Sequence, residues 1–212
     1  MEYLNSFKTI LVYEAKTSTV QLVERIFFSG GLNFEVMNIL EFERKVEDNL
    51  PLDAIPLIIR SVDYKLVDLV KRLCINKVPF AYYIDDNFWE IKGSTPLAKY
   101  YQHPIIRDGL KYIVGHASMV LCNSAPLADY IRDRYTKRVS VVPPMFDFNL
   151  LEGVHSYCGE EIRIGFAGSS SRLKDINFLK NVIPDILEKY PRVVFEFAGV
   201  MPEGVKISDR IR

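Results

Sequence analysis

Short apolar runs alternate along this chain with longer stretches whose apolar residues recur at helical spacing. The run at residues 9–15 (TILVYEA) leaves no room for polar alternation, as in a strand that is covered on both faces. Residues 19–29 follow with Val20, Val23 and Ile26 on one helical face, and Gly30 and Gly31 predict the end of that helix. This order predicts βαβ units in a parallel sheet.

The same alternation continues to about residue 144. Further strands are predicted at residues 34–40, 57–61, 80–84, 119–122 and 139–142, and helices at residues 62–75, from Pro96 with a resumption at 105–114, and at 125–135. Crossovers between such strands should be right-handed. The expected fold class is α/β, with a doubly wound, Rossmann-like parallel sheet.

Residues 145–161 show no clear periodicity and are predicted to be a linker, after which the pattern restarts. A strand is expected at 162–167, a helical stretch at 175–190 that Pro184 kinks or divides, and a strand at 192–198. The predicted domains are therefore 1–144, Rossmann-like, and 162–212, the beginning of a second Rossmann-like domain. One βαβ unit cannot bury its own faces, so this second domain is expected to be incomplete or to be completed by a partner chain.

Composition narrows the classes of function. Lys plus Arg and Asp plus Glu both number 27, so no net charge favours nucleic acid as a partner. No signal peptide and no membrane-spanning stretch is predicted. The cysteines and histidines are few and scattered, which predicts neither a disulfide framework nor a metal site and fits a cytoplasmic location. They are Cys74, Cys122, Cys158, His103, His116 and His155.

Adjacent acids follow the fourth predicted strand, in the sequence Asp85-Asp86-Asn87-Phe88-Trp89. Ligands of open parallel sheets bind outside the carboxyl ends of the strands, and this is such an end. The carboxylates of Asp85 and Asp86 could orient or deprotonate an acceptor hydroxyl, and Trp89 could stack on a sugar ring. The alternative is that an acid caps a turn and that Trp89 belongs to the core.

Small residues follow the first strand of the second predicted domain, at Gly165 and from Gly168 to Ser171. Backbone N–H groups at such a turn can approach a phosphate closely, and Arg172 and Lys174 would add positive charge. The alternative is a tight turn in which glycine only permits close packing. Two further residues could face the crevice at the carboxyl ends of the predicted strands, beside Asp85 and Asp86. They are His103, at a predicted helix break, and Arg60, for which the alternative is a pair with a surface acid.

Three stretches together resemble glycosyltransferases of the GT-B type with a group-one (family 4-like) C-terminal domain. The first is residues 80–89 (FAYYIDDNFW), the second 116–131 (HASMVLCNSAPLADYI), and the third 163–169 (RIGFAGS) with Lys174, Asp175 and 194–199 (VFEFAG). The resemblance covers most of the chain in order. It implies two Rossmann-like domains, with the acceptor on the first and a nucleotide-diphosphate sugar on the second.

The resemblance also implies roles for particular residues. Asp85, Asp86 and Lys174 would be catalytic, and Trp89 and His103 would bind the acceptor. The donor would be bound by Gly168, Ser169, Ser170, Arg172 and Lys174. Such enzymes usually retain anomeric configuration, and they use the nucleotide sugar as substrate without a cofactor or an essential metal.

The chain departs from the family pattern at three places. Ser169 stands where arginine is frequent, and Lys16-Thr17-Ser18-Thr19 replaces a glycine-rich loop. The acids that hold the sugar and ribose would lie beyond Arg212, so the chain alone is expected not to be fully active.

The leading hypothesis is therefore a cytoplasmic transferase that moves a hexose-like sugar to a glycan, lipid-linked or small acceptor. Peripheral contact with the inner face of the membrane is left open. The alternative is a non-catalytic Rossmann-like module that binds a partner subunit or a glycan. A receiver-like regulator is disfavoured, because its acidic pair would follow the first strand, where this chain has Lys16-Thr17-Ser18.

Overall fold

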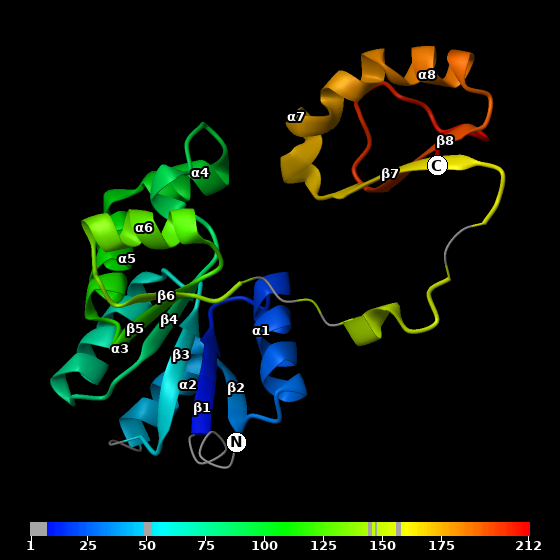
Figure 1. The fold of residues 1–212 in the computed structure, drawn as a ribbon. Helices are drawn as coiled ribbons and strands as arrows, with labels where there is room; N and C mark the ends of the chain where they lie inside the picture. The colour runs from blue at the N-terminus through cyan, green and yellow to red at the C-terminus, as the bar shows by residue number, and fades with distance from the viewer. Residues whose placement is uncertain (1–7, 49–51, 144–145, 147, 156–157) are drawn as a thin grey trace. The chain divides into compact units, whose positions relative to one another are not determined.

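The computed structural model describes residues 8–48, 52–143, 146, 148–155 and 158–212. The chain divides into two compact units, Met1–Leu150 and Leu151–Arg212. The first unit is built on a six-stranded sheet in the order β2-β1-β3-β4-β5-β6, and all neighbouring strands in it are parallel (Figure 1). The strands are β1 (Lys8–Tyr13), β2 (Phe34–Asn38), β3 (Ala54–Ile59), β4 (Ala81–Ile84), β5 (Met119–Cys122) and β6 (Val139–Val141).

Helices cover both faces of this sheet. On one face, Val20 and Val23 of α1 pack against Leu11, Leu57 and Ile59 of the central strands. On the other face, the larger core joins buried residues of α2, α3, α5 and α6 to those of the strands. The helices are α1 (Ser18–Ser29), α2 (Ile39–Asp48), α3 (Tyr64–Ile75), α4 (Pro96–Gln102), α5 (Pro104–His116) and α6 (Ala125–Arg134). The predicted α/β, doubly wound, Rossmann-like class is confirmed.

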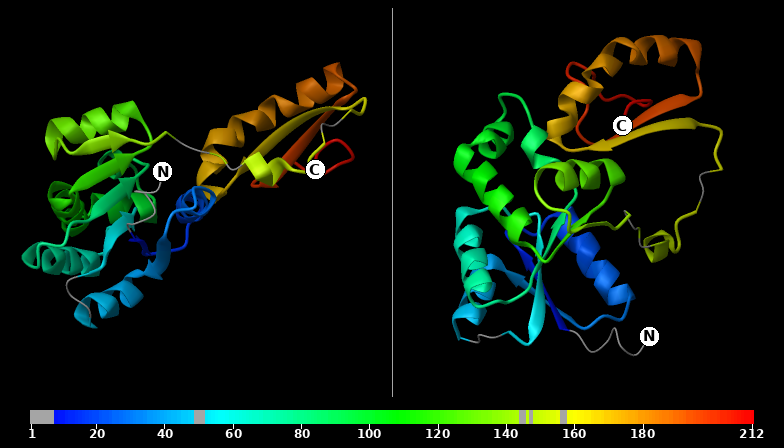
Figure 2. Two further views of the ribbon diagram at one scale, coloured as in Figure 1. Left: turned by 60° about the horizontal axis from the view of Figure 1, so that its bottom comes forward. Right: turned by 60° about the vertical axis from the view of Figure 1, so that its left-hand side comes forward.

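Helices α3 and α5 lie side by side (Figure 2), and a glycine allows their close approach. A Cβ atom added at Gly109 of α5 would lie 2.9 Å from Cγ2 of Val67 on α3. The two helices therefore pack with backbone against side chain at this point.

The strand order reverses at β1. β2 pairs with one edge of β1, and β3 pairs with its other edge, from which β4, β5 and β6 continue outward. Crossovers on either side of such a reversal leave opposite faces of the sheet, so a crevice forms outside the carboxyl ends of β1 and β3.

The second unit contains the parallel pair β7 (Ile162–Gly168) and β8 (Val193–Gly199). Between them lie η4 (Ser170–Arg172), α7 (Leu173–Ile176), η5 (Asn177–Asn181) and α8 (Ile183–Lys189). Its small core consists of Ile183, Val193, Phe195 and Ile211 with partly buried neighbours. Residues 210–212 run beside β8, where the Arg212 amide donates to the Phe195 carbonyl at 2.9 Å.

Most predicted elements lie where the pattern placed them. Pro184 divides the predicted helix 175–190, because it occupies the first turn of α8 after a short 3₁₀ segment. The strand predicted at 34–40 was too long, because β2 ends at Asn38 and α2 begins at Ile39. Within the predicted linker the chain forms a 3₁₀ turn, η3 (Phe148–Leu151). Some residues in or next to the predicted linker lie outside the described residues, namely 144, 145, 147, 156 and 157.

Candidate functional site

Polar side chains converge at the carboxyl edge of the first unit, where β1, β3 and β4 end. Arg60 follows β3, and Asp85 and Asp86 follow β4. Thr19 lies in the first turn of α1, the helix that leaves β1. We call Thr19, Arg60, Asp85 and Asp86 the switch-point cluster, because it lies at the reversal in strand order where open α/β sheets bind ligands.

Asp85 is held from two sides. Nη1 of Arg60 lies 2.7 Å from Oδ1 and 2.8 Å from Oδ2 of Asp85, with hydrogen-bond geometry to Oδ2. The Thr19 hydroxyl donates to the same Oδ2 at 2.8 Å. The Asp85 side chain is 16% exposed, so its charge is largely shielded from water and is balanced by the guanidinium.

Asp86 is paired but open to solvent. Nη2 of Arg60 lies 2.9 Å from Oδ2 of Asp86, whose side chain is 58% exposed. Arg60 therefore links both carboxylates with two arms of its planar fork. Of the pair, Asp86 is the carboxylate that a ligand in solvent can reach.

Arg60 itself has an unusual backbone conformation, with a φ angle of 55°. The left-handed region is costly for a residue with a Cβ atom and persists only where neighbouring contacts enforce it. Here the Arg60 amide donates to the Tyr83 carbonyl at 2.9 Å, and the buried Tyr82 hydroxyl donates to the Ser61 carbonyl at 3.2 Å. These bonds hold the turn between β3 and α3 from which the Arg60 side chain reaches the β4 acids.

The electrostatic balance favours a permanently charged Arg60. Burial acts to lower the pKa of Arg60, but the charge and hydrogen bond of Asp85, with a further contribution from Asp86, raise it above its usual value. The guanidinium is thus a fixed positive centre between two carboxylates.

Two aromatic rings, those of Phe88 and Tyr101, pack beside this cluster. The Arg60 guanidinium carbon lies 5.2 Å from the centroid of the Phe88 ring, which is itself stacked on Tyr101 at 4.5 Å. Burial raises the pKa of Tyr101, and the charges of Arg60, Glu14 and Asp86 also act on its hydroxyl. Phe88 thus lies between the Arg60 guanidinium and Tyr101 of α4.

Trp89 does not have the role that was expected of it. The side chain is 3% exposed, and its ring stacks on Tyr135 at 4.3 Å. A buried indole offers no face to an acceptor sugar, so the reading of Trp89 as a core residue replaces the stacking prediction. His103 is exposed at the junction between α4 and α5, and its predicted contact with an acceptor stays a prediction.

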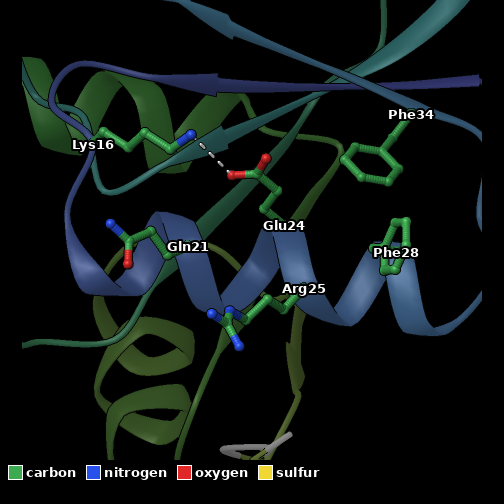
Figure 3. A pocket seen from close by; sticks show the side chains of 6 residues that line it. All are labelled: Lys16, Gln21, Glu24, Arg25, Phe28 and Phe34. Atoms are coloured by element: carbon green, nitrogen blue, oxygen red, sulfur yellow. Dashed lines mark ion pairs between the residues drawn. The ribbon is translucent and has the colours of Figure 1, made fainter. Parts of the chain in front are cut away.

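The residues that replace a glycine-rich loop serve the local fold (Figure 3). Thr17 occupies the N-cap position of α1, and Lys16 pairs with Glu24 of that helix at 3.3 Å. Both charged residues line a hollow of about 360 Å³ along α1, which continues to Phe28 and Phe34. Because Phe34 begins β2, this hollow follows the helix away from the carboxyl edge of the sheet.

In the second unit, the predicted donor residues gather where β7 ends. Gly168 is the last residue of β7, Ser169 and Ser170 begin the η4 turn, and Lys174 is exposed in the first turn after it. Arg172 pairs with Asp175 at 3.2 Å on an open surface. The geometry thus places these residues on one turn at a strand end, and their contact with a diphosphate stays a prediction.

The glycines of this turn have a clear packing role. Gly168 and Gly199 are partners in the β7–β8 register, and a Cβ atom on Gly199 would lie 2.1 Å from the Gly168 carbonyl oxygen. Gly199 also has a φ angle of 99°. The close packing that the sequence offered as an alternative is therefore present at this point.

The described residues also bear on metal binding and on membrane insertion. None of their His, Cys, Asp and Glu side chains form a group of three or more that could hold a metal ion. No helix in this part of the chain has the length and apolar character needed to cross a membrane.

Comparison with known proteins reveals a structural likeness at low sequence identity. No family model and no curated protein sequence matches the chain. Crystal structures of HepE from Anabaena are similar to it, with TM-scores of 0.53 for the complex with UDP and glucose, 0.55 for that with UDP-glucose and 0.52 for that with UDP. The identities are 12%, 14% and 13%, over 91%, 96% and 90% of this chain.

The chain spans 61%, 68% and 69% of the three HepE chains. At such identities the likeness establishes the fold, an α/β architecture with Rossmann-like units. It leaves the family 4-like assignment as a prediction.

Sequence reasoning identified part of the switch-point cluster. The two acids were found because they follow a predicted strand, and Arg60 was noted as a residue that could face the same crevice. Thr19 was missed. The available signal was its position in the first turn of the helix after β1, which the topology brings to the same edge as β3 and β4.

Proposed function

We propose that this chain is part of a glycosyltransferase that transfers a sugar from a nucleotide-diphosphate sugar to a hydroxylated acceptor. The observation that carries the proposal is the switch-point cluster. In it Asp86 pairs with Arg60 and remains exposed to solvent at the edge of the sheet where open α/β folds bind ligands. Support also comes from the similar fold of HepE, which has been crystallised with UDP-glucose.

The proposed reaction joins an acceptor oxygen to the anomeric carbon of the donor. The bond between that carbon and the diphosphate oxygen breaks, the nucleoside diphosphate leaves with the bonding electrons, and the proton of the acceptor hydroxyl passes to a carboxylate. A carboxylate that accepts a hydrogen bond from this hydroxyl orients it for attack.

The contacts divide the roles of the two acids. Both oxygens of Asp85 lie beside Arg60, and one of them also accepts from Thr19. Asp85 therefore serves to position Arg60. Asp86, with its exposed carboxylate, is the residue proposed to contact the acceptor hydroxyl.

On the donor side, the turn after β7 is proposed to hold the diphosphate. Gly168, Ser169 and Ser170 would offer backbone N–H groups, and Arg172 and Lys174 would balance the charge of the leaving group. We further propose a hexose as the transferred sugar, retention of anomeric configuration, no metal or other cofactor, and a glycan, lipid-linked or small acceptor. A cytoplasmic location, with contact at the inner face of the membrane, belongs to the same proposal.

The second candidate is a non-catalytic module that binds a partner chain. It is favoured by the exposed apolar residues of β7, of which Ile162 is 50% and Ile164 is 41% exposed. The two residues lie two positions apart and so share one face of the strand, and adjoining exposed apolar residues mark candidate interaction surfaces. A module of this kind would bind a partner without consuming any nucleotide sugar.

The test uses the full-length product of the gene. It is incubated with UDP-glucose, UDP-galactose, UDP-N-acetylglucosamine or GDP-mannose and with mono- and oligosaccharide acceptors, and release of the nucleoside diphosphate is measured. The proposal expects one donor to be consumed in an acceptor-dependent way. If no donor is consumed and none protects the protein from thermal unfolding, the glycosyltransferase proposal fails and the non-catalytic module takes its place.

A further inference from the structure

A second hollow lies at the carboxyl edge of the first unit, beside the switch-point cluster. Its volume is about 530 Å³, which falls in the range of roughly 300–1,000 Å³ that is usual for small-molecule sites. It opens where β1 and β2 end and where α2 and α3 begin. The lining residues are Tyr13, Glu14, Asn38, Ile39, Leu40, Asp63, Tyr64 and Lys65.

The polar groups of this hollow suit hydroxyl groups. Asp63 caps α3 by accepting from the Lys65 amide through Oδ1, and its second oxygen is a further acceptor. The Oδ1 atom of Asn38 accepts from the Glu41 amide, which orients the side-chain amide nitrogen as a donor. Glu14 adds a carboxylate that accepts from the Val62 amide at 3.4 Å. Donors and acceptors are therefore mixed around one space.

Charge argues against a phosphate in this hollow. Two carboxylates, Glu14 and Asp63, face one ammonium group, Lys65, among the lining residues. A dianionic ligand would meet net negative charge there. A neutral, polyhydroxylated ring would not.

The hollow also offers aromatic and apolar surface. Tyr64 is 59% exposed at the start of α3, and Leu40 is 52% exposed at the start of α2. An exposed tyrosine ring can cover the apolar face of a sugar while its hydroxyl stays in water. Ile39, which is buried, supports the floor.

This hollow adjoins the switch-point cluster. Glu14 lines the hollow and accepts from the amide of Val62, which lies two residues after Arg60. Asp63, which also lines the hollow, follows Val62 directly. The hollow and the cluster therefore share the turn between β3 and α3.

We propose that this hollow binds one neutral sugar ring of the acceptor, with Tyr64 stacked on the ring and with Glu14 and Asp63 accepting hydrogen bonds from its hydroxyls. The inference rests on the proposed function, which it deepens by naming the acceptor as a saccharide and by placing its ring on the first unit. It assigns acceptor contact to Tyr64 in place of the buried Trp89.

Saturation-transfer NMR tests the proposal with the full chain. The probes are the methyl glycosides of glucose, galactose, mannose and N-acetylglucosamine, each without nucleotide. We expect transfer to at least one probe, weakened about fivefold by Tyr64→Ala and retained in Tyr64→Phe, which keeps the ring. Tyr190→Ala, which removes a tyrosine that is 48% exposed in the second unit, should leave the transfer unchanged.

Two results would overturn the inference. One is the absence of transfer to every probe, and the other is equal transfer in the wild type and in Tyr64→Ala. Folding is checked by the fluorescence of Trp89, the one tryptophan of the sequence, so loss of structure is recognised separately. Failure of the glycosyltransferase proposal is also distinct, because it would show as no consumption of any nucleotide sugar while probe binding persists.

Discussion

Nη1 of Arg60 lies between the two carboxylate oxygens of Asp85, at 2.7 Å and 2.8 Å. Arg60 makes this contact from a left-handed backbone conformation that hydrogen bonds on both sides of the turn maintain. Its second arm pairs with Asp86. The end of β3 and the end of β4 are thereby joined through side chains at the carboxyl edge of the sheet, and the bond from Thr19 to Asp85 extends this junction to the helix that follows β1, where the strand order reverses.

The first prediction concerns the stability of this junction. Arg60→Met leaves Asp85 shielded from water without its partner and should lower the free energy of unfolding of the first unit by about 3 kcal/mol. The double variant Arg60→Met, Asp85→Leu should lose less than the sum of the single variants, since it leaves no uncompensated charge. Urea unfolding followed by Trp89 fluorescence measures both, because Trp89 is buried in this unit. Additive losses would show that the pair is not coupled.

The second prediction concerns the packing of β7 against β8. Gly199→Ala would place a Cβ atom 2.1 Å from the Gly168 carbonyl oxygen, so it should unfold the second unit or lower its stability by more than the ~1–2 kcal/mol that a positive φ alone costs. Gly204→Ala is the matched control, since its φ angle is 82° and no atom lies within 4 Å of an added Cβ. Limited proteolysis between residues 162 and 212 should be much faster in Gly199→Ala than in Gly204→Ala, which carries only the cost of the positive φ.

The third prediction concerns pH. Burial raises the pKa of Glu14 above its ordinary value of 4.5, although hydrogen bonding from the Val62 amide opposes the shift. The folded state therefore binds this proton more tightly than the unfolded state does, and Glu14 reduces stability as pH rises through the shifted pKa. Glu14→Gln should raise the melting temperature at pH 7, with the difference vanishing below the ordinary glutamate value. A lower melting temperature at pH 7 would contradict this assignment.

The destabilising effect of the charged Glu14 carboxylate is consistent with a role in ligand binding. A group that the fold disfavours in its charged form is expected where function requires the charge. The same variant should weaken binding of the methyl glycosides that test the hollow, so one substitution is expected to gain stability and to lose ligand.

The fold of the first unit could be predicted from the sequence because its strands are covered on both faces. Continuous apolar runs such as residues 9–15 (TILVYEA) have few other interpretations, and Gly30-Gly31 and Pro96 mark helix boundaries by local chemistry. The start of α2 at Ile39 was missed, since apolar residues lie on both sides of Asn38, with Val36 and Met37 before it and Ile39 and Leu40 after it. Asn38 and Glu41, which cap each other's amides, were the signal that could have separated the two elements.

The site was harder to predict, because it depends on which strand ends are neighbours. Asp85 and Asp86 were identified from their place after a strand, but the contact between Asp85 and Thr19 spans 66 positions and follows from the strand order. Trp89 was misjudged for the same reason. Its burial results from Tyr135, which α6 and the following turn bring beside it, and no local pattern specifies that packing.

The most direct test of the central claim is the rate of sugar transfer in Asp86→Asn, measured with the full-length protein and the donor it consumes. Asp68→Asn is the matched control, because Asp68 is a similarly exposed acid, at 63% against 58% for Asp86, and lies on the surface of α3. The account predicts that Asp86→Asn lowers kcat by about a hundredfold or more, with Trp89 fluorescence and donor affinity unchanged, whereas Asp68→Asn stays near the wild-type rate. Equal rates in all three proteins would contradict the placement of acceptor chemistry at the switch-point cluster.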